Sequence, residues 1–232
     1  MSPRWFRQAL PPRLKSNPSP AELRRMARHP SAYAPTAAEV LNPPIPPMPV
    51  ATAAPHLRTV LDRPDDDAAR LAYANWIKAA DPARAEFIRR QLIGDSAGDL
   101  LGEYGVRWAA EFAPWGARDL VYRRGFVEAM SLTGRSFISL GAGLFDATPL
   151  REVRLIAVNF LMEELIACPH LAKLDVLNLR GNQLGDAGAE MLMRCPWLGG
   201  LKRLELEGNG LSAGCEARLK KVFGQSLLEF DL

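Results

Sequence analysis

The sequence is poor in the side chains that most often carry out catalysis or bind metals. Among 232 residues there are only three cysteines and three histidines, and His29, His56 and His170 share no motif. No C-x-x-C pair, G-x-S-x-G, P-loop or dinucleotide-binding fingerprint occurs in the chain. Metal sites and nucleophile–base pairs draw largely on these residue types and spacings. We therefore predict a protein that is not an enzyme and that binds no metal or cofactor.

The three cysteines do not form the even, closely spaced set of a disulfide framework. Cys168 and Cys195 stand 27 residues apart and each precedes a proline. The next residue is His170 in one copy and Trp197 in the other. This exchange predicts that the position serves packing rather than catalysis. Small buried thiols are typical of a reducing compartment.

Long apolar runs are also missing. No window approaches the roughly 18 apolar residues that a membrane helix needs. Residues 1–13 lack the apolar centre of a secretory signal. These absences predict a cytoplasmic protein that does not span a membrane.

Proline is concentrated at one end, because 13 of the 19 prolines lie in residues 1–55. The same segment has seven basic and two acidic residues, a net charge of +5, which leaves −2 for the remainder. Such a composition predicts an extended or disordered arm, interrupted by short helices where Ser19–Glu22 and Thr36–Glu39 form capping boxes. Its predicted partner-binding residues are the apolar Trp5, Phe6, Leu23, Met26 and Tyr33. A disordered leader is the alternative.

The pattern of apolar and capping residues over 56–124 predicts a helical domain. The acidic run 62–67 is expected to cap a helix over 68–80, and Asp81-Pro82 to begin a second helix. The two form a helical hairpin. Residues 94–105 contain several glycines and are expected to be a looser linker, before packing resumes at Trp108, Phe112 and Trp115.

The last third of the chain repeats one pattern. Leu174-x-x-Leu177-x-Leu179-x-x-Asn182-x-Leu184 recurs with an offset of 27 from Leu201 to Leu211. This is the signature of a leucine-rich repeat, in which a strand and a helix alternate and the asparagines form a hydrogen-bonded ladder. Degenerate copies start at Val127 and Leu150, and a final strand at Leu227. Residues 125–232 are therefore predicted to form a short α/β solenoid with parallel strands.

Two segments resemble known families. Asp65–Ile77 resembles the opening of the bacterial repeat-companion domain, Asp81–Gln91 resembles its second half, and Arg124–Glu128 matches what commonly follows. Asn75 and Ala80 depart from the family pattern, which has aspartate and glycine there. Gly185–Leu192 resembles the helices of ribonuclease-inhibitor-like repeats. The resemblance over 57–92 implies a small domain beside repeats, with no activity to inherit.

Strand alternation places the residues between the leucines on an open face. The predicted partner-binding residues on this face are Arg154, Asn178, Arg180, Arg203, Glu205, Glu207 and Asp231. Their charge changes from basic in the centre to acidic toward the end. Mixed charge favours a protein partner over nucleic acid, which prefers a uniformly basic surface. A solvated face without a ligand is the alternative.

These patterns favour a protein-interaction module, a scaffold or accessory subunit docked into a larger assembly by its arm. One alternative is a structural stabiliser whose arm wraps a large complex, and another is a nucleic-acid accessory protein with a basic arm. Because the last predicted strand has no capping repeat after it, we also expect a homodimer through that end or a partner that covers it.

Overall fold

The computed structural model describes residues 55–224 with their side chains and the backbone of residues 229–231. All of them belong to one unit of the chain, Pro47–Leu232. The predicted arm, including Trp5, Phe6, Leu23, Met26 and Tyr33, lies outside the described residues except for Pro55. The two capping boxes of the arm also lie outside them.

The first described part is helical, as predicted. Its helices are α3 (Pro55–Asp62), α4 (Asp67–Ile77), α5 (Pro82–Leu92) and α6 (Gly98–Ala110). Asp66 caps α4 by accepting the N–H of Ala68 at 2.9 Å, and Asp81 caps α5 by accepting that of Arg84 at 3.0 Å. The caps and the packing of α4 on α5 confirm the predicted hairpin.

The prediction of a loose linker over 94–105 was wrong, because α6 occupies most of it. Glycine disfavours helix by about 1 kcal/mol per residue relative to alanine, which is why the segment resembled a loop. Trp108 on α6 is fully buried, with its ring centroid 5.0 Å from Phe87 and 5.7 Å from Tyr104. Burial of these rings outweighs the local glycine penalty.

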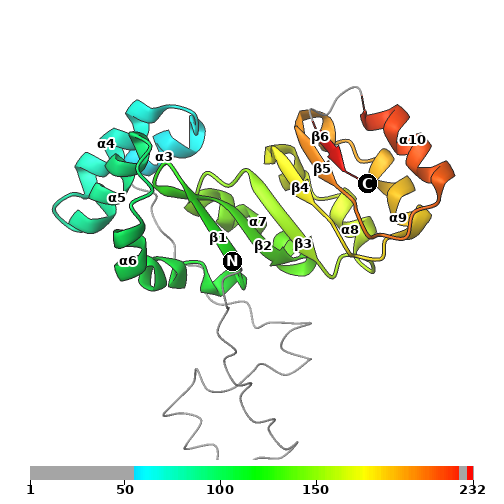
Figure 1. Ribbon diagram of the computed structural model, residues 1–232, viewed down its shortest axis with the longest axis horizontal. Coiled ribbons are helices and arrows are strands. Elements are labelled where there is room, and N and C mark those ends of the chain that lie inside the picture. Colours follow the sequence, from blue (N-terminus) through cyan, green and yellow to red (C-terminus); the bar gives the residue numbers. More distant parts are fainter. Residues whose placement is uncertain (1–54, 225–228, 232) are drawn as a thin grey trace, which may run out of the picture. The chain divides into compact units, whose positions relative to one another are not determined.

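Six strands form one sheet in the order in which they occur along the chain (Figure 1). They are β1 (Arg118–Arg123), β2 (Phe126–Thr133), β3 (Glu152–Ile156), β4 (Val176–Asn178), β5 (Arg203–Glu205) and β6 (Glu229–Asp231). Strand β1 pairs antiparallel with β2, and all later neighbours are parallel. The sequence indicated no strand at β1.

Helical segments connect the parallel strands. They are α7 (Gly134–Ala147), α8 (Met162–Ile166), η3 (Pro169–Lys173), α9 (Gly185–Met193), η4 (Leu198–Gly200) and α10 (Ala213–Phe223); a short η2 (Ala113–Trp115) precedes β1. Figure 1 shows α8, α9 and α10 following β3, β4 and β5 in turn. The expected alternation of strand and helix is therefore present.

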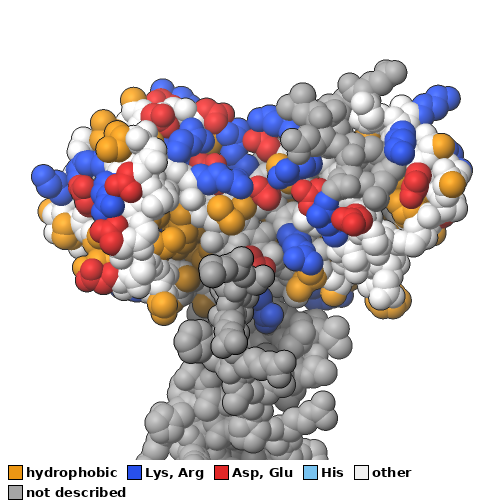
Figure 2. Space-filling model, viewed as in Figure 1, with side chains coloured by type: hydrophobic (Ala, Val, Ile, Leu, Met, Phe, Trp, Pro, Cys, Tyr) orange, Lys and Arg blue, Asp and Glu red, His pale blue; other side chains and the backbone are white. Residues whose placement is uncertain are grey.

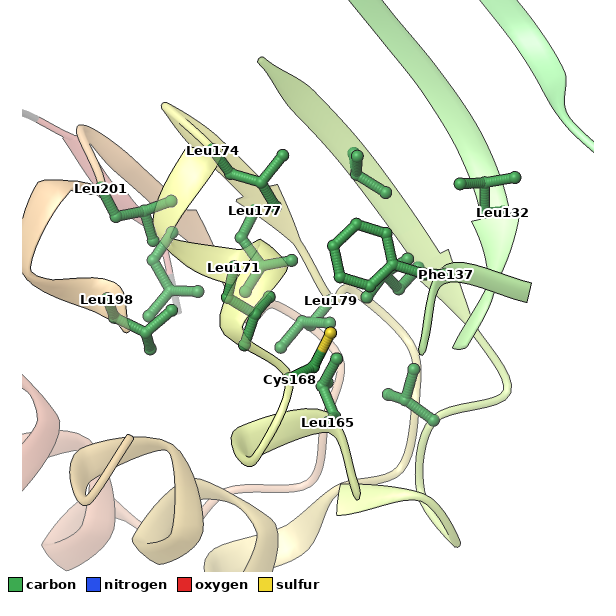
Figure 3. Packing of buried hydrophobic residues seen from close by; sticks show 14 of the residues in the cluster. Leu132, Phe137, Leu165, Cys168, Leu171, Leu174, Leu177, Leu179, Leu198 and Leu201 are labelled. Atoms are coloured by element: carbon green, nitrogen blue, oxygen red, sulfur yellow. The ribbon is translucent and has the colours of Figure 1, made fainter. Parts of the chain in front are cut away.

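The strand register matches the alignment of the repeats. Val153 pairs with Leu177, Leu177 with Leu204, and Leu204 with Phe230. The leucines of successive strands are buried together with residues from the helical segments in one core, part of which Figure 3 shows. The core also holds Cys168, while the ring of His170 packs on Phe145 with the centroids 5.8 Å apart.

The asparagine ladder is formed as predicted. Asn182 donates through Nδ2 to the carbonyl oxygens of Leu155 and Leu179, both at 2.8 Å, and accepts the N–H of Val158 at 3.2 Å. Asn209 repeats the arrangement one strand later and accepts the N–H of Asn182 at 2.9 Å. Each amide thus satisfies backbone groups that the turn would otherwise leave buried and unpaired.

Among the helices in the described residues, none is both long and apolar enough to cross a membrane.

Candidate functional site: the open face of the sheet

The sheet has one face turned toward the leucine core and one turned away from it, which we call the open face. Paired residues on adjacent strands point to the same side, so the register defines its columns. The central column consists of Arg118, Ser131, Arg154, Asn178, Glu205 and Asp231. A flanking column consists of Val121, Ala129, Glu152, Val176, Arg203 and Glu229. Arg180 and Glu207 follow β4 and β5 at the next outward position.

The structure brings most of the predicted face residues into one charge cluster on β4 and β5. Glu205 lies at its centre and accepts a hydrogen bond from Nδ2 of Asn178. The same carboxylate lies 3.4 Å from Nε of Arg180 and 3.2 Å from Nε of Arg203. Arg180 also lies 3.5 Å from Glu207. The Glu205 side chain is only 12% exposed, so these charges neutralise one another rather than pointing freely into solvent.

The other half of the open face, on β1 to β3, has a different character. Arg118 and Arg154 are exposed, and within the described residues neither side chain has a hydrogen bond or an ion pair. Between them on β2 lies Ser131, which is only 8% exposed, while Ala129, 3% exposed, lies in the flanking column beside Val121. We call the six residues Arg118, Val121, Ala129, Ser131, Arg154 and Ile156 the basic strip. Of the predicted face residues it contains Arg154 alone.

Asp231 stands beside Glu205 in the backbone register, as the sequence predicted. It extends the central column by one strand. The predicted change from basic to acidic along this column is therefore correct in position. The sequence did not reveal that Arg180 and Arg203 lie close to Glu205 and neutralise its negative charge.

A second group of charges lines the edge at which the parallel strands begin. Arg151 lies 2.9 Å from Asp175, and Lys202 lies 3.2 Å from the same carboxylate. Arg151 also donates to Asp65, just before α4, with Nη2 at 3.1 Å from Oδ2. Figure 2 shows basic and acidic side chains alternating along this upper edge. The ion pairs connect the helical part with the repeats, which the sequence did not predict.

The electrostatics of this edge favour the ionised form of Asp65. Its pKa lies below the usual value, chiefly because Arg151 donates a hydrogen bond to the carboxylate, and the positive charges of Arg151 and Arg124 add to the effect. Partial burial opposes the shift. In turn, the hydrogen bond to Asp65 raises the pKa of Arg151. The pairing therefore keeps both partners charged at neutral pH.

Helices α4 and α5 form an open groove that the sequence also did not indicate. Its apolar side chains include Leu71, Leu92 and Ile93, while Asp67, Glu86, Arg89 and Arg90 contribute charges of both signs. Leu71 is 43% exposed and Ile93 is 82% exposed. Beside the groove on α4, Trp76 is 53% exposed, whereas Ile77 is only 8% exposed. The groove is therefore an exposed, partly apolar surface. Because its charges are of both signs, they favour neither an acidic nor a basic ligand.

Comparison with known proteins gives one positive finding. No curated protein and no solved structure matches the chain. A family model described as Leucine Rich repeat matches residues 168–193. The match begins before η3, includes β4 and the ladder residue Asn182, and ends with α9. The chain therefore contains a leucine-rich repeat at the segment where the structure places one strand and its following helix.

Proposed function

We propose that this chain is a non-catalytic protein-interaction module and that the open face of the sheet binds its partner. The leucine-rich repeat at 168–193 suggests protein binding. The observation that carries the proposal is the shared register of β2 to β5, which aligns outward side chains in columns across neighbouring strands. A short solenoid with this register offers a partner a continuous surface of strands.

The described cysteines and His170 serve packing, which is consistent with this proposal. Cys168 and Cys215 are buried in the leucine core, and burial raises the pKa of both thiols. Burial also lowers the pKa of His170, which lies against Phe145. Raised thiol pKa values reduce the thiolate fraction on which nucleophilic cysteines depend.

We further propose that the module acts as a scaffold or accessory subunit, with residues 1–55 as a docking arm. The sequence of the arm supports this role, because Trp5, Phe6, Leu23, Met26 and Tyr33 alternate with prolines and basic residues. When a partner covers the apolar side chains of such an arm, the burial of apolar surface stabilises the complex. The resemblance of residues 57–92 to the repeat-companion domain supports the same role.

The test is affinity purification of tagged full-length protein under native conditions, with bound proteins quantified by mass spectrometry. One variant replaces the five apolar arm residues with serine, and a second carries Asn178→Ala and Arg180→Ala on the open face. Lys221→Glu on α10 is the control because it is exposed on a helix that packs on the leucine side of the sheet. We expect one stoichiometric partner with wild type and control, and its loss in at least one of the two variants. Failure of the wild-type protein to retain any stoichiometric partner would contradict the proposal.

A homodimer through β6 is part of the same proposal. This strand forms one edge of the described sheet, and an edge strand offers unpaired backbone groups to another chain. Sedimentation velocity over a range of concentrations tests it. A species of twice the mass that increases with concentration is expected, whereas a monomer at every concentration would exclude self-association.

A further inference from the structure

The two halves of the open face are not equivalent, and this difference points to the kind of partner. On β4 and β5 the carboxylate of Glu205 already has Arg180 and Arg203 within 3.4 Å. On β1 and β3, Arg118 and Arg154 have no charged partner within the described part of the chain. Building on the proposed function, we propose that the basic strip binds an extended, acidic segment of a partner protein.

The shape of the strip fits an extended chain. Arg118 and Arg154 pair with Ser131 from opposite sides, so their Cα atoms are separated by two strand spacings, or about 10 Å. Ser131 lies between the arginines, and its side chain is short and only 8% exposed, so it does not separate a ligand from either guanidinium group. In an extended segment, residues two apart in sequence lie on the same side, about 7 Å from each other. Two acidic residues at this spacing would therefore reach both arginines, because the long arginine side chains span the remaining distance.

The strip also offers apolar contacts beside the charges. Val121 is 42% exposed and Ile156 is 37% exposed. Guanidinium groups form charge-assisted, bidentate hydrogen bonds with carboxylates. A segment that alternates acidic and apolar residues would therefore satisfy both features of the strip.

Charge distinguishes an acidic segment from three alternative occupants, which are the arm of the same chain, a second copy of the chain and nucleic acid. Residues 1–55 carry a net charge of +5, so the arm of the same chain would be repelled by the two arginines. A second copy could offer Glu205 and Glu207, but both already lie within 3.5 Å of Arg180. Nucleic acid is disfavoured because the face beyond the strip carries Glu205 and Glu207, whereas nucleic acid prefers a uniformly basic surface.

The experiment measures binding of fluorescein-labelled peptides to full-length protein by fluorescence anisotropy. The probe peptide alternates glutamate with valine and serine, and comparison peptides carry glutamine or lysine in place of glutamate. The main variant is R118E/R154E. Its matched control is K220E/K221E on the exposed side of α10, which makes the same charge change away from the open face, and R118K/R154K preserves the charge. Circular dichroism melting checks that each variant is folded.

We expect the glutamate peptide to bind best and R118E/R154E to weaken its binding by at least about tenfold, with K220E/K221E within about twofold of wild type and R118K/R154K intermediate. Three results would overturn the inference: no preference for glutamate over glutamine, an equal loss with K220E/K221E, or unchanged binding by folded R118E/R154E.

The outcome remains distinct from that of the proposed function. If the partner retained in the native purification binds R118E/R154E as well as it binds wild type, the face still binds a protein but the strip is not its site. If wild type retains no partner at all, the proposed function fails, and the peptide result alone decides whether the strip recognises acidic segments.

Discussion

Nη2 of Arg70 donates a hydrogen bond of 2.6 Å to Oε1 of Glu128, and these two side chains are 0% and 5% exposed. Arg70 lies on α4 and Glu128 on β2, so the pair joins the helical part to the sheet. The same guanidinium also donates to the carbonyl oxygens of Pro64, Arg123 and Arg124. Burial lowers the pKa of Arg70, and the charge of Glu128 counteracts that shift.

Arg70→Met should reduce the free energy of unfolding by about 3–5 kcal/mol, because it leaves the buried carboxylate of Glu128 with Arg124 alone, at 3.3 Å, and takes the donor from three backbone carbonyl oxygens. The double variant R70M/E128L removes both charges and should be clearly more stable than R70M alone. Urea denaturation followed by circular dichroism measures both values. Equal stability of R70M and wild type would show that the pair contributes little.

Asn182→Ala should reduce the free energy of unfolding by about 1–3 kcal/mol, because two carbonyl oxygens and the N–H of Val158 lose their partner inside the protein. The control is Asn75→Ala, whose exposed amide accepts one hydrogen bond from Arg89 at 2.8 Å. Its effect should stay within about 0.5 kcal/mol. Thermal melts that rank the two variants in the opposite order would argue against a structural ladder.

Gly125→Ala should be more destabilising than an ordinary glycine substitution. Gly125 has a φ of +86°, and a Cβ there would lie 2.7 Å from the Cα of Ile88 on α5. Positive φ and overpacking together predict a loss of roughly 3 kcal/mol. The control Gly116→Ala has a φ of +66° with no atom within 4 Å, so it tests the backbone conformation alone. Denaturation midpoints should fall further for Gly125→Ala, and equal midpoints would exclude the close contact with Ile88.

The stability contribution of Asp65 should depend on acid pH. The folded-state pKa lies below the usual 3.8 because Arg151 donates a hydrogen bond, so the contribution is present above pH 3.8 and disappears as the pH falls through the folded-state value. Because the Asp65 side chain is mostly exposed, solvent screening limits the effect to under about 1 kcal/mol. Unfolding measured from neutral to acid pH should show the difference between wild type and Asp65→Asn shrinking below about pH 4. Asp119→Asn, on exposed Asp119, is the control, and a difference that grew toward acid pH would reverse the expected sign.

Local sequence patterns determined the repeat part of the fold. The spacing of leucines at 174, 177 and 179, and again at 201, 204 and 206, was sufficient to predict both the strands and their register. Such a pattern works because strand alternation assigns each residue to one face, and the next repeat presents the same pattern to its neighbour. The asparagine ladder and the helix caps at Asp66 and Asp81 follow from equally local geometry.

Tertiary structure alone decided which charges are available on the surface. Arg151 and Asp65 are 86 residues apart in sequence, and Arg70 and Glu128 are 58 apart, so no local pattern connects either pair. Helix α6 likewise depends on a tertiary contact. Its Trp108 packs on Phe87 of α5, although the glycines of α6 disfavour a helix. On the open face, the sequence placed Arg154 and Arg180 in neighbouring columns as equals. Only the folded chain brings Glu205 to Arg180, because ion pairing depends on distance across strands rather than on position along the chain.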